Sequence, residues 1–340
     1  MSQTPAPPIT FRAVDEDRPG PKMRALFQQR AESYAAWYLR DGDAARPSIA
    51  EGEQALRTHM PELVPVYERM VSEVADGDPT AARMFTFLRP PASLVSCSQG
   101  VWRDGDDGPV LVRNYDYAPE LMDGLILKSR FLDRTVIGTA DGLWGLCDGV
   151  NDRGLVVSLT FGGRVVVGDG FGMPLVVRYL LETCDEVDEA RAILERLPYS
   201  QAYNLTLADT HGHVFTAYLG PDRVPSFRRI PIATNHQWVP ESWDLVLAES
   251  SVAREWWLIR LLDDPDITAA AFSDAFLAAP LYSNAHAEGV GTVYTAAYVP
   301  EASAVTYRWP GHDWTLQMHD FREGEYIPVF PAPPIAPALV

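Results

Sequence analysis

The N-terminal quarter of the chain carries its apolar residues at helical spacing. From Pro21 to about Gly42, large apolar side chains recur every three or four positions, which predicts an amphipathic helix with one buried face. Start signals predict three further helices: a capping box at Ser48 and Glu51 for a helix reaching about His59, and prolines at first-turn positions, Pro61 and Pro79. We therefore expect residues 21–96 to be mainly helical and the proline-rich residues 1–20 to form an extended or mobile arm.

The pattern changes after Arg89-Pro90-Pro91, because proline restricts its own backbone and that of the residue before it. Residues 94–103 and 109–117 are rich in strand-forming residues, and a run of Gly and Asp separates them. This arrangement is typical of a β-hairpin. The boundary between a helical part and a β-rich part of the chain is expected here.

The β-rich part alternates between strand pairs and helix pairs. Strands are expected over residues 134–139, 143–147, 155–161, 203–208, 214–219, 292–298 and 303–309, and helices over residues 174–183, 186–197 and about 247–262. Hairpins interrupted by helix pairs indicate antiparallel sheet covered by helices on its outer faces, which is an α+β fold. The proline-rich tail over residues 327–340 suggests no role.

Charge and cysteine content restrict the partners. Acidic residues outnumber basic residues by 46 to 28, which gives a formal net charge of −18 and disfavours nucleic acid and anionic membranes as partners. No run reaches the ~18 apolar residues of a membrane-spanning helix, and the start of the chain lacks the regions of a signal peptide. Because three scattered cysteines fit a reducing compartment, we expect a soluble, cytoplasmic protein. Its oligomeric state stays open, a homo-oligomer included.

Cys97 lies on the first strand of the predicted hairpin. The second strand carries Arg113 and Asp116, and strand pairing would bring a guanidinium and a carboxylate beside the thiol. A lone cysteine on a strand is more often a buried apolar residue than a nucleophile, and we interpret Cys147 and Cys184 in that way. The charged neighbours make Cys97 the candidate nucleophile.

Two further motifs follow this hairpin and make a family recognisable. Cys97 and the Arg-Asn-Tyr-Asp-Tyr of residues 113–117 are followed by a second motif at residues 148–161 and by Ala-Thr-Asn-His at residues 233–236. In this order, the motifs resemble those of N-terminal nucleophile hydrolases of the choloylglycine (bile salt) hydrolase and penicillin acyltransferase type. The resemblance extends to about residue 307 and implies a four-layer αββα sandwich.

In those enzymes the cysteine is the first residue of the mature catalytic chain. The resemblance therefore implies that this chain cuts itself between Ser96 and Cys97, which leaves residues 97–340 as the catalytic chain. The helical segment, residues 21–96, is expected to stay bound as a separate chain, because its apolar helix faces would otherwise be exposed.

The resemblance also implies a role for each site residue. The new α-amine of Cys97 would have a pKa of ~7.7–8.0, close enough to the ~8.5 of a thiol to take its proton. Asp116 would hold this amine, and Arg113 would favour the thiolate. Asn235 would donate its side-chain amide to the oxyanion, with the backbone N–H near Thr160 as the second donor. Relatives usually carry asparagine at the position of Thr160, but a backbone donor does not depend on the side chain. This chemistry calls for no cofactor and no metal.

These residues indicate an amidohydrolase or acyltransferase that acts on a linear amide through a Cys97 thioester, with a small-molecule amide or acyl donor as its partner. The sequence leaves hydrolysis and transfer open. The alternative is an uncleaved, non-catalytic member that acts as a binding or partner protein. Relatives carry an arginine near residues 286–292, where this chain has Glu288. We therefore expect an apolar acyl pocket and a neutral or cationic leaving group, unless Arg254 or Arg308 binds a carboxylate.

Three other patterns compete with this interpretation. The glycines at 168, 170 and 172 resemble a dinucleotide-binding turn, but the third comes one residue early and no βαβ series surrounds it. Asp209, His211 and His213 could offer metal ligands, although a turn between two strands is expected there. His236 could pair with Cys97, but we prefer a structural histidine, because no papain-like sequence surrounds the cysteine.

Overall fold

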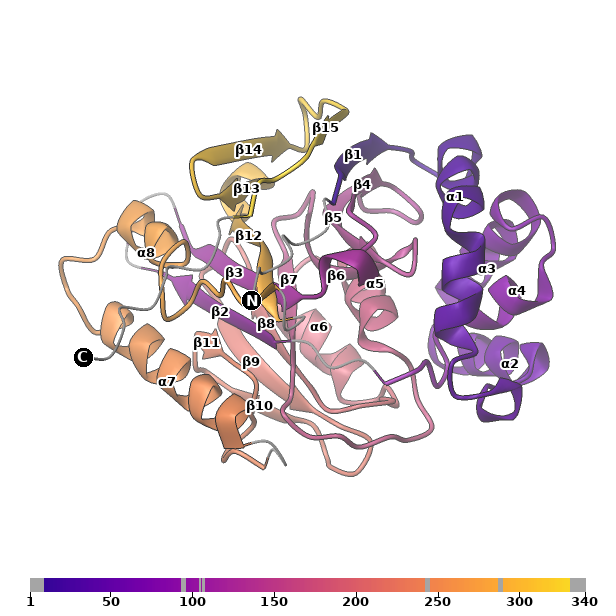
Figure 1. Ribbon diagram of the computed structural model, residues 1–340, viewed down its shortest axis with the longest axis horizontal. Helices are drawn as coiled ribbons and strands as arrows, with labels where there is room; N and C mark the ends of the chain where they lie inside the picture. The colour runs from indigo at the N-terminus through magenta and orange to yellow at the C-terminus, as the bar shows by residue number, and fades with distance from the viewer. Residues whose placement is uncertain are drawn as a thin grey trace, which may run out of the picture.

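The computed structural model describes residues 9–92, 96–103, 105, 108–241, 245–286 and 290–330. Two sheets make up its centre (Figure 1). The strands of the larger sheet are β1 (Phe11–Asp15), β4 (Leu125–Ser129), β5 (Val136–Asp141), β6 (Gly145–Asn151), β7 (Val156–Phe161), β8 (Tyr203–Ala208), β9 (Val214–Leu219), β10 (Ser226–Arg228) and β15 (Gly324–Tyr326). Their order is β10-β9-β8-β7-β6-β5-β4-β1-β15, and only β1 and β4 pair in parallel.

The smaller sheet has the order β11-β2-β3-β12-β13-β14, and its strands pair antiparallel. The bounds are β2 (Ser96–Trp102), β3 (Val110–Tyr117), β11 (Ile232–Ala233), β12 (Gly291–Val299), β13 (Ala304–Trp309) and β14 (His312–Gln317). Strands β2 and β3 form the predicted hairpin, in which Cys97 is paired with Tyr115 and Gln99 with Arg113. The hairpin prediction is confirmed.

Helices lie on both outer faces and at one end. The α-helices are α1 (Pro21–Tyr38), α2 (Ile49–His59), α3 (Val64–Arg69), α4 (Pro79–Met84), α5 (Met173–Thr183), α6 (Val187–Leu194), α7 (Leu245–Leu262) and α8 (Ala269–Ala275). Short 3₁₀ turns cover Asp43–Ala45, Pro61–Leu63, Pro119–Leu121 and Pro300–Ala302, and a π-turn covers Met70–Val74. The capping box predicted for α2 is present, with the backbone N–H of Glu51 donating to Ser48.

The layers follow the order helix, sheet, sheet, helix. Gln99 of β2 crosses between the sheets and donates to the Ser158 carbonyl of β7 and the Thr206 hydroxyl of β8. Helix α5 packs on the larger sheet, where the Cβ of any residue other than glycine at Gly149 would lie 2.8 Å from Leu181. Helices α7 and α8 cover the smaller sheet. A Cβ at Gly100 of β2 would lie 2.8 Å from the ring of Phe272 in α8, so only glycine leaves room for this ring. The expected αββα sandwich is therefore confirmed.

The helical segment is joined to this sandwich through β1. We expected residues 1–20 to be an extended or mobile arm, but Phe11–Asp15 form a strand between β4 and β15. Phe11 is fully buried against Tyr294 and Trp309, and this burial makes the strand stable. Residues 1–8 of the expected arm lie outside the described residues. The mobile-arm prediction is therefore wrong for residues 11–15.

Helices α1 to α4, drawn in indigo and purple, lie beside the sandwich at one end (Figure 1). The hydroxyl of Tyr34 in α1 donates to Asp123 at 2.7 Å, and Arg196 donates to the carbonyl of His59 at 2.7 Å. Between the helices and the sandwich, the chain passes through Pro90 and Pro91 toward β2. The helical segment therefore reaches the N-terminal end of the strand that carries Cys97.

Candidate active site

The side chain of Cys97 is fully buried. Cys97 alternates along β2 with Ser96 and Ser98, so it projects with Gln99 into the space between the two sheets. Arg113 of β3 projects into the same space, and its Nη2 donates to the Sγ of Cys97 at 3.2 Å. The hairpin therefore brings the predicted guanidinium and thiol into direct contact.

Besides the thiol of Cys97, Arg113 contacts a carboxylate, that of Asp148. Its Nη1 lies 2.6 Å from the Oδ2 of Asp148 on β6, and neither side chain is exposed. The hydroxyls of Tyr294 and Tyr298 also donate to Asp148, and the ring of Tyr115 lies 4.7 Å from the guanidinium carbon. Because these contacts come from both sheets, the guanidinium has a fixed position beside the sulfur.

Burial dominates the titration of the thiol. The pKa of Cys97 is raised from 9.0 to about 11, first because burial penalises the thiolate. Arg113 lowers this pKa, Asp116 raises it through its charge, and the backbone N–H of Asp116 lowers it by hydrogen bonding. Arg113 therefore favours the thiolate as expected, but in the uncut chain the net shift keeps the thiol neutral.

Asn235 connects the cysteine to the larger sheet. Its Oδ1 accepts from the backbone N–H of Cys97 at 2.9 Å and from the hydroxyl of Ser96 at 3.1 Å. Its Nδ2 donates to the carbonyl of Phe161 at 3.1 Å. Gly163 passes so close that a Cβ at this position would lie 2.3 Å from the Asn235 carbonyl oxygen, and its φ is +80°. Only glycine fits there without strain, which keeps this loop against Asn235.

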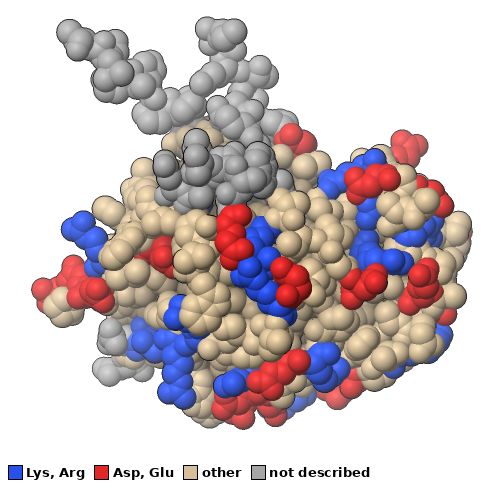
Figure 2. Space-filling model, turned by 90° about the horizontal axis from the view of Figure 1, so that it is seen from below, with Lys and Arg blue, Asp and Glu red and all other residues tan. Residues whose placement is uncertain are grey.

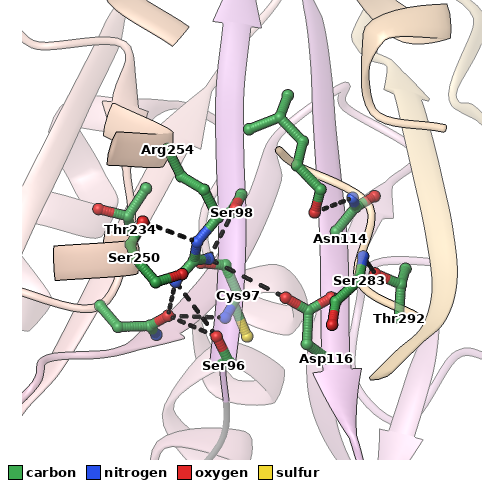
Figure 3. Close-up of polar contacts among 12 residues, drawn as sticks. Ser96, Cys97, Ser98, Asn114, Asp116, Thr234, Ser250, Arg254, Ser283 and Thr292 are labelled. Carbon is green, nitrogen blue, oxygen red and sulfur yellow. Dashed lines mark hydrogen bonds and ion pairs between the residues drawn. The ribbon is translucent and has the colours of Figure 1, made fainter. Parts of the chain in front are cut away.

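Arg254 of α7 has a larger part in the site than the sequence indicated. Its Nη1 donates to the carbonyl of Cys97 and to the hydroxyl of Ser98, and its Nη2 donates to the Oδ1 of Asn235 at 2.9 Å (Figure 3). Only 4% of Arg254 is exposed. Because internal oxygens occupy its donors, Arg254 holds the strand around Cys97 and is unavailable to a substrate carboxylate.

Asp116 lies on the other face of β3, toward the helix layer. Its Oδ1 accepts from the hydroxyl of Thr292 at 2.7 Å, and its Oδ2 lies 4.0 Å from Nη1 of Arg254 (Figure 3). Burial raises the pKa of Asp116 to about 6, while Arg254 and the Thr292 hydrogen bond lower it. The hydrogen-bond acceptor for the Cys97 backbone nitrogen in the uncut chain is Asn235, so the predicted role of Asp116 toward the amine stays a prediction.

Other predicted residues take structural positions. His236 accepts or donates at Ser251, 2.8 Å away, and at Glu255, 3.1 Å away, which is the structural role that we preferred. The hydroxyl of Thr160 donates to the Thr234 carbonyl at 3.1 Å and so supports the segment that ends in Asn235. Arg308 is bound by Ser273, Asp274 and Asp313, whereas Glu288 lies outside the described residues.

A cavity of about 100 Å³ lies beside strand β3, where Tyr115 and Tyr117 belong to its lining. Its lining combines residues of the helical segment, of the linker before β2 and of both sheets, among them Trp37, Pro91, Tyr115, Leu159 and Tyr203. Tyr115 is the strand partner of Cys97. Nothing in the sequence indicated that α1 would line a pocket next to the cysteine, because the apolar face of a helix is usually interpreted as core.

The described residues contain neither a metal-binding cluster nor a membrane-spanning helix. Across the described part of the chain, no group of three or more His, Cys, Asp or Glu side chains has a geometry suited to a metal ion. His213 lies 3.3 Å from Asp209 at the turn between β8 and β9. No helix among the described residues is both long and apolar enough to cross a membrane.

Two facing sheets with helices on both sides, and a cysteine with an arginine and an asparagine between them, define an N-terminal nucleophile hydrolase fold. The sequence model of one family, described as acyl-coenzyme A:6-aminopenicillanic acid acyl-transferase, matches residues 102–314. This match covers more than half of the chain, and the chain belongs to that family. It begins after Cys97, so it does not test the cysteine itself.

Solved structures show more distant likenesses. A conjugated bile acid hydrolase variant from Clostridium perfringens is 11% identical, with 71% of this chain and 99% of that chain covered and a TM-score of 0.48. Penicillin V acylase from Agrobacterium tumefaciens is 12% identical, with 66% and 86% covered and a TM-score of 0.40. An N-acylethanolamine-hydrolyzing acid amidase ortholog from Caenorhabditis elegans is 14% identical, with 60% and 93% covered and a TM-score of 0.45. No curated protein matches the chain. At these values, the family assignment depends on the family model alone.

Proposed function

We propose that the chain cuts itself between Ser96 and Cys97 and then acts on linear amides through a thioester on Cys97. The contact between Arg113 and the Sγ of Cys97, 3.2 Å long, is the observation that carries this proposal. A buried guanidinium next to a thiol stabilises the nucleophilic thiolate. Membership of an acyltransferase family supports the same chemistry, because acyl transfer needs a nucleophile that holds the acyl group.

In the proposed cut, the Sγ of Cys97 attacks the carbonyl carbon of Ser96. A sulfur–carbon bond forms, the carbon–nitrogen bond breaks, and the thiol proton ends on the nitrogen that becomes the α-amine of Cys97. Water then hydrolyses the thioester, which releases the Ser96 carboxylate and regenerates the thiol. Arg254 supports this step by holding the Ser96 hydroxyl and the Cys97 carbonyl in place.

After the cut, the α-amine replaces the histidine that other thiol enzymes use as a base. It takes the proton of Cys97 while the sulfur attacks the substrate carbonyl, and it returns the proton to the leaving amine. Asp116 holds this amine. The side-chain amide of Asn235 and a backbone N–H near Thr160 donate to the oxyanion, as the family resemblance implies. Water then completes hydrolysis, or an amine accepts the acyl group.

Intact-mass measurement of the purified chain tests this proposal. The wild type should give two masses, for residues 1–96 and 97–340, and Cys97→Ala should give one uncut mass. Cys97→Ser is the matched variant, because a hydroxyl retains a weaker nucleophile and should slow the cut without abolishing it. Cleavage of Cys97→Ala at the same bond would show that another nucleophile or a protease makes the cut.

An uncleaved binding protein is the second candidate function. The full burial of Cys97 and the raised pKa of its thiol favour it, because a neutral, covered thiol is a poor nucleophile. In that case, the wild type gives one mass, and its Cys97 does not react with an amide substrate. Two masses together with turnover would exclude this candidate.

A further inference from the structure

Six aromatic side chains line the cavity beside β3, and one of them, Tyr115, is the strand partner of Cys97. They come from α1, from the linker and from both sheets, and they are Tyr34, Trp37, Phe87, Tyr115, Tyr117 and Tyr203. The faces of aromatic rings carry partial negative charge and attract cations, so such a lining suits an ammonium group as well as an alkyl chain. The lining therefore does not by itself choose between an apolar and a cationic substrate.

The charged residues of the lining favour a cationic substrate over an apolar one. Three carboxyl groups, those of Glu120, Asp123 and Asp141, face the cavity together with one guanidinium, that of Arg30. Arg30 donates to the carbonyl of Met122 at 2.9 Å and lies 3.8 Å from Asp123. The balance of charge in the cavity is therefore negative, and its guanidinium is already paired.

The two aspartates differ in their partners. Asp123 is buried and accepts from the hydroxyl of Tyr34 at 2.7 Å and from the backbone N–H of Leu143 at 2.9 Å. Asp141 ends β5, and among the residues that the structure describes only the backbone N–H of Gly142 donates to its carboxyl group. Within the described residues, no Lys, Arg or His lies within ion-pair distance of Asp141. When it is ionised, the carboxylate of Asp141 therefore has no counterion there, and an unpaired charge in such a site costs free energy.

Asp141 shares its cavity with the strand partner of Cys97. Tyr115 and Tyr203 line the cavity together with Asp141; burial raises the pKa of both phenol groups, and the charges of Asp141 and Cys97 each raise it further. Because Tyr115 pairs with Cys97 across β2 and β3, the strand partner of the cysteine lines the same cavity as Asp141. A substrate that lies in this cavity therefore contacts the surroundings of Asp141 next to the strand pair that carries Cys97.

We propose that Asp141 determines substrate specificity by binding a primary ammonium group of the substrate, with the aromatic lining around it. This inference rests on the proposed function, whose substrate it specifies as an amide that carries an amine. The substrate would supply the positive charge that Asp141 lacks in this partly aromatic cavity.

Two observations support this assignment. The pKa of Asp141 is raised to about 7, first by burial and then by the charge of Asp123, which is the condition of a carboxylate that lacks a cation. On the surface seen in Figure 2, Lys and Arg side chains lie among Asp and Glu side chains instead of leaving one acidic area. The face seen there therefore presents no single acidic area that would select a cationic substrate.

Matched amides test the proposal. β-Alanyl 4-nitroanilide and butanoyl 4-nitroanilide differ only by an ammonium group in place of a methyl group on the acyl side. N-butanoyl-ethylenediamine and N-propylbutanamide make the same comparison on the amine side. We expect kcat/KM to be about tenfold or more higher for the ammonium member of at least one pair, mainly through a lower KM. Higher kcat/KM for the neutral member of both pairs would overturn the proposal.

Asp141→Asn should reduce this preference to about twofold or less, since the amide keeps the shape of the carboxylate and removes its charge. Asp320→Asn is the matched control, because it removes the same charge from an exposed residue paired with Arg322 outside the cavity. It should keep the wild-type preference. An equal loss in both variants would assign the effect to net charge and overturn the proposal.

Binding to Cys97→Ala separates this proposal from the reaction. Calorimetry with β-alanyl 4-nitroanilide and butanoyl 4-nitroanilide should show tighter binding of the ammonium member, and the addition of Asp141→Asn should abolish the difference. If this difference is present but the wild type neither cleaves itself nor turns over any amide, the proposed function fails and the role of Asp141 stands. If the two ligands bind equally, the role of Asp141 fails independently of catalysis.

Discussion

The guanidinium of Arg113 lies 3.2 Å from the sulfur of Cys97, and yet the pKa of that thiol is raised to about 11. The reason is that burial outweighs the guanidinium, whose charge is shared with Asp148 at 2.6 Å. The uncut chain therefore holds a positioned but neutral nucleophile. In the proposed cut, the thiol proton passes to the nitrogen of the bond that breaks. In later turnover, the α-amine that the cut releases would be the base that removes the proton of the thiol.

Replacement of Arg113 should make the thiol of the cut protein less acidic. Because Arg113 lowers the pKa of Cys97, Arg113→Gln should raise it, and a neighbouring opposite charge typically shifts a pKa by about 1–3 units. We expect alkylation of Cys97 by iodoacetamide at pH 8 to be about tenfold or more slower and its pH profile to move upward. A profile equal to that of the wild type would show that Arg113 does not stabilise the thiolate.

A second variant separates this effect from misfolding. Arg113→Gln leaves Asp148 as a buried, unpaired charge, which typically costs about 3–5 kcal/mol. The double variant Arg113→Gln and Asp148→Asn removes both charges and should recover much of this loss, as measured by chemical denaturation. Its thiol should still be alkylated slowly. Arg308→Gln, which changes an arginine on β13, is the control for the loss of one positive charge.

Asn235 offers a sharper test, because its two ends have different tasks. Its Oδ1 accepts from Cys97 and Arg254, whereas its Nδ2 is the proposed oxyanion donor. Asn235→Asp keeps an acceptor oxygen and removes the donor, so kcat should fall by about 10²–10³-fold with a small change in KM. Measurement of both constants on one amide decides this. An increased KM with unchanged kcat would make Asn235 a binding residue instead.

The sequence predicted local elements better than distant pairings. Helix α1, the β2–β3 hairpin and strands β8 and β9 depend on short-range periodicity and turn residues, and they lie close to the predicted positions. Strand β1 was missed because it has only five residues in a proline-rich region and pairs in parallel with β4, more than a hundred residues away. Strand β4 was missed as well, since its apolar run lies between irregular segments.

The contacts of the candidate site also differ in how far they could be predicted from the sequence. A hairpin fixes the register that pairs Cys97 with Tyr115 and Gln99 with Arg113, so the sequence was sufficient for the contact between Arg113 and Cys97. The contacts of Arg254 were not predictable, because α7 reaches β2 across 157 positions of the chain and its sequence resembles an ordinary core helix. Asp141 has no motif around it. Its proposed role rests on the lack of a nearby cation among the described residues and on its place in the cavity lining, and periodicity reports neither.

The helical segment should remain bound after the cut. Strand β1 completes the larger sheet, and Phe11 is fully buried against Tyr294 and Trp309 of the catalytic chain. Phe11→Ala should weaken this association by about 3–5 kcal/mol, the usual loss for a buried phenylalanine. Gel filtration of the cut protein should show both chains together for the wild type and partial separation for Phe11→Ala.

Arg12→Ala is the control on the same strand. Its guanidinium pairs with Glu325 at 2.8 Å on the surface, and such pairs contribute at most about 1 kcal/mol. The two chains of Arg12→Ala should therefore elute together as in the wild type. If the wild-type chains separate without denaturant, the segment is a removable propeptide and the cavity lining contributed by α1 would be lost with it.

The last prediction concerns the cost of Asp141 to stability. Its folded pKa of about 7 lies above the ordinary value of 3.8, so the folded state binds this proton more tightly than the unfolded state. Stability should therefore fall as pH rises from about 4 to about 7, and above that window the ionised carboxylate destabilises the fold.

Asp123, Glu120 and Arg30 face the same cavity and are unchanged in Asp141→Asn. This variant should melt at a higher temperature than the wild type at pH 8, and the difference should shrink toward pH 4. Thermal melts of both proteins at these two pH values, with Asp320→Asn as control, decide the matter. A lower melting temperature for Asp141→Asn at pH 8 would mean that the carboxylate has a stabilising partner in the free protein. A stabilising variant that loses the preference for ammonium would instead show that this residue is kept for its ligand and against the stability of the fold.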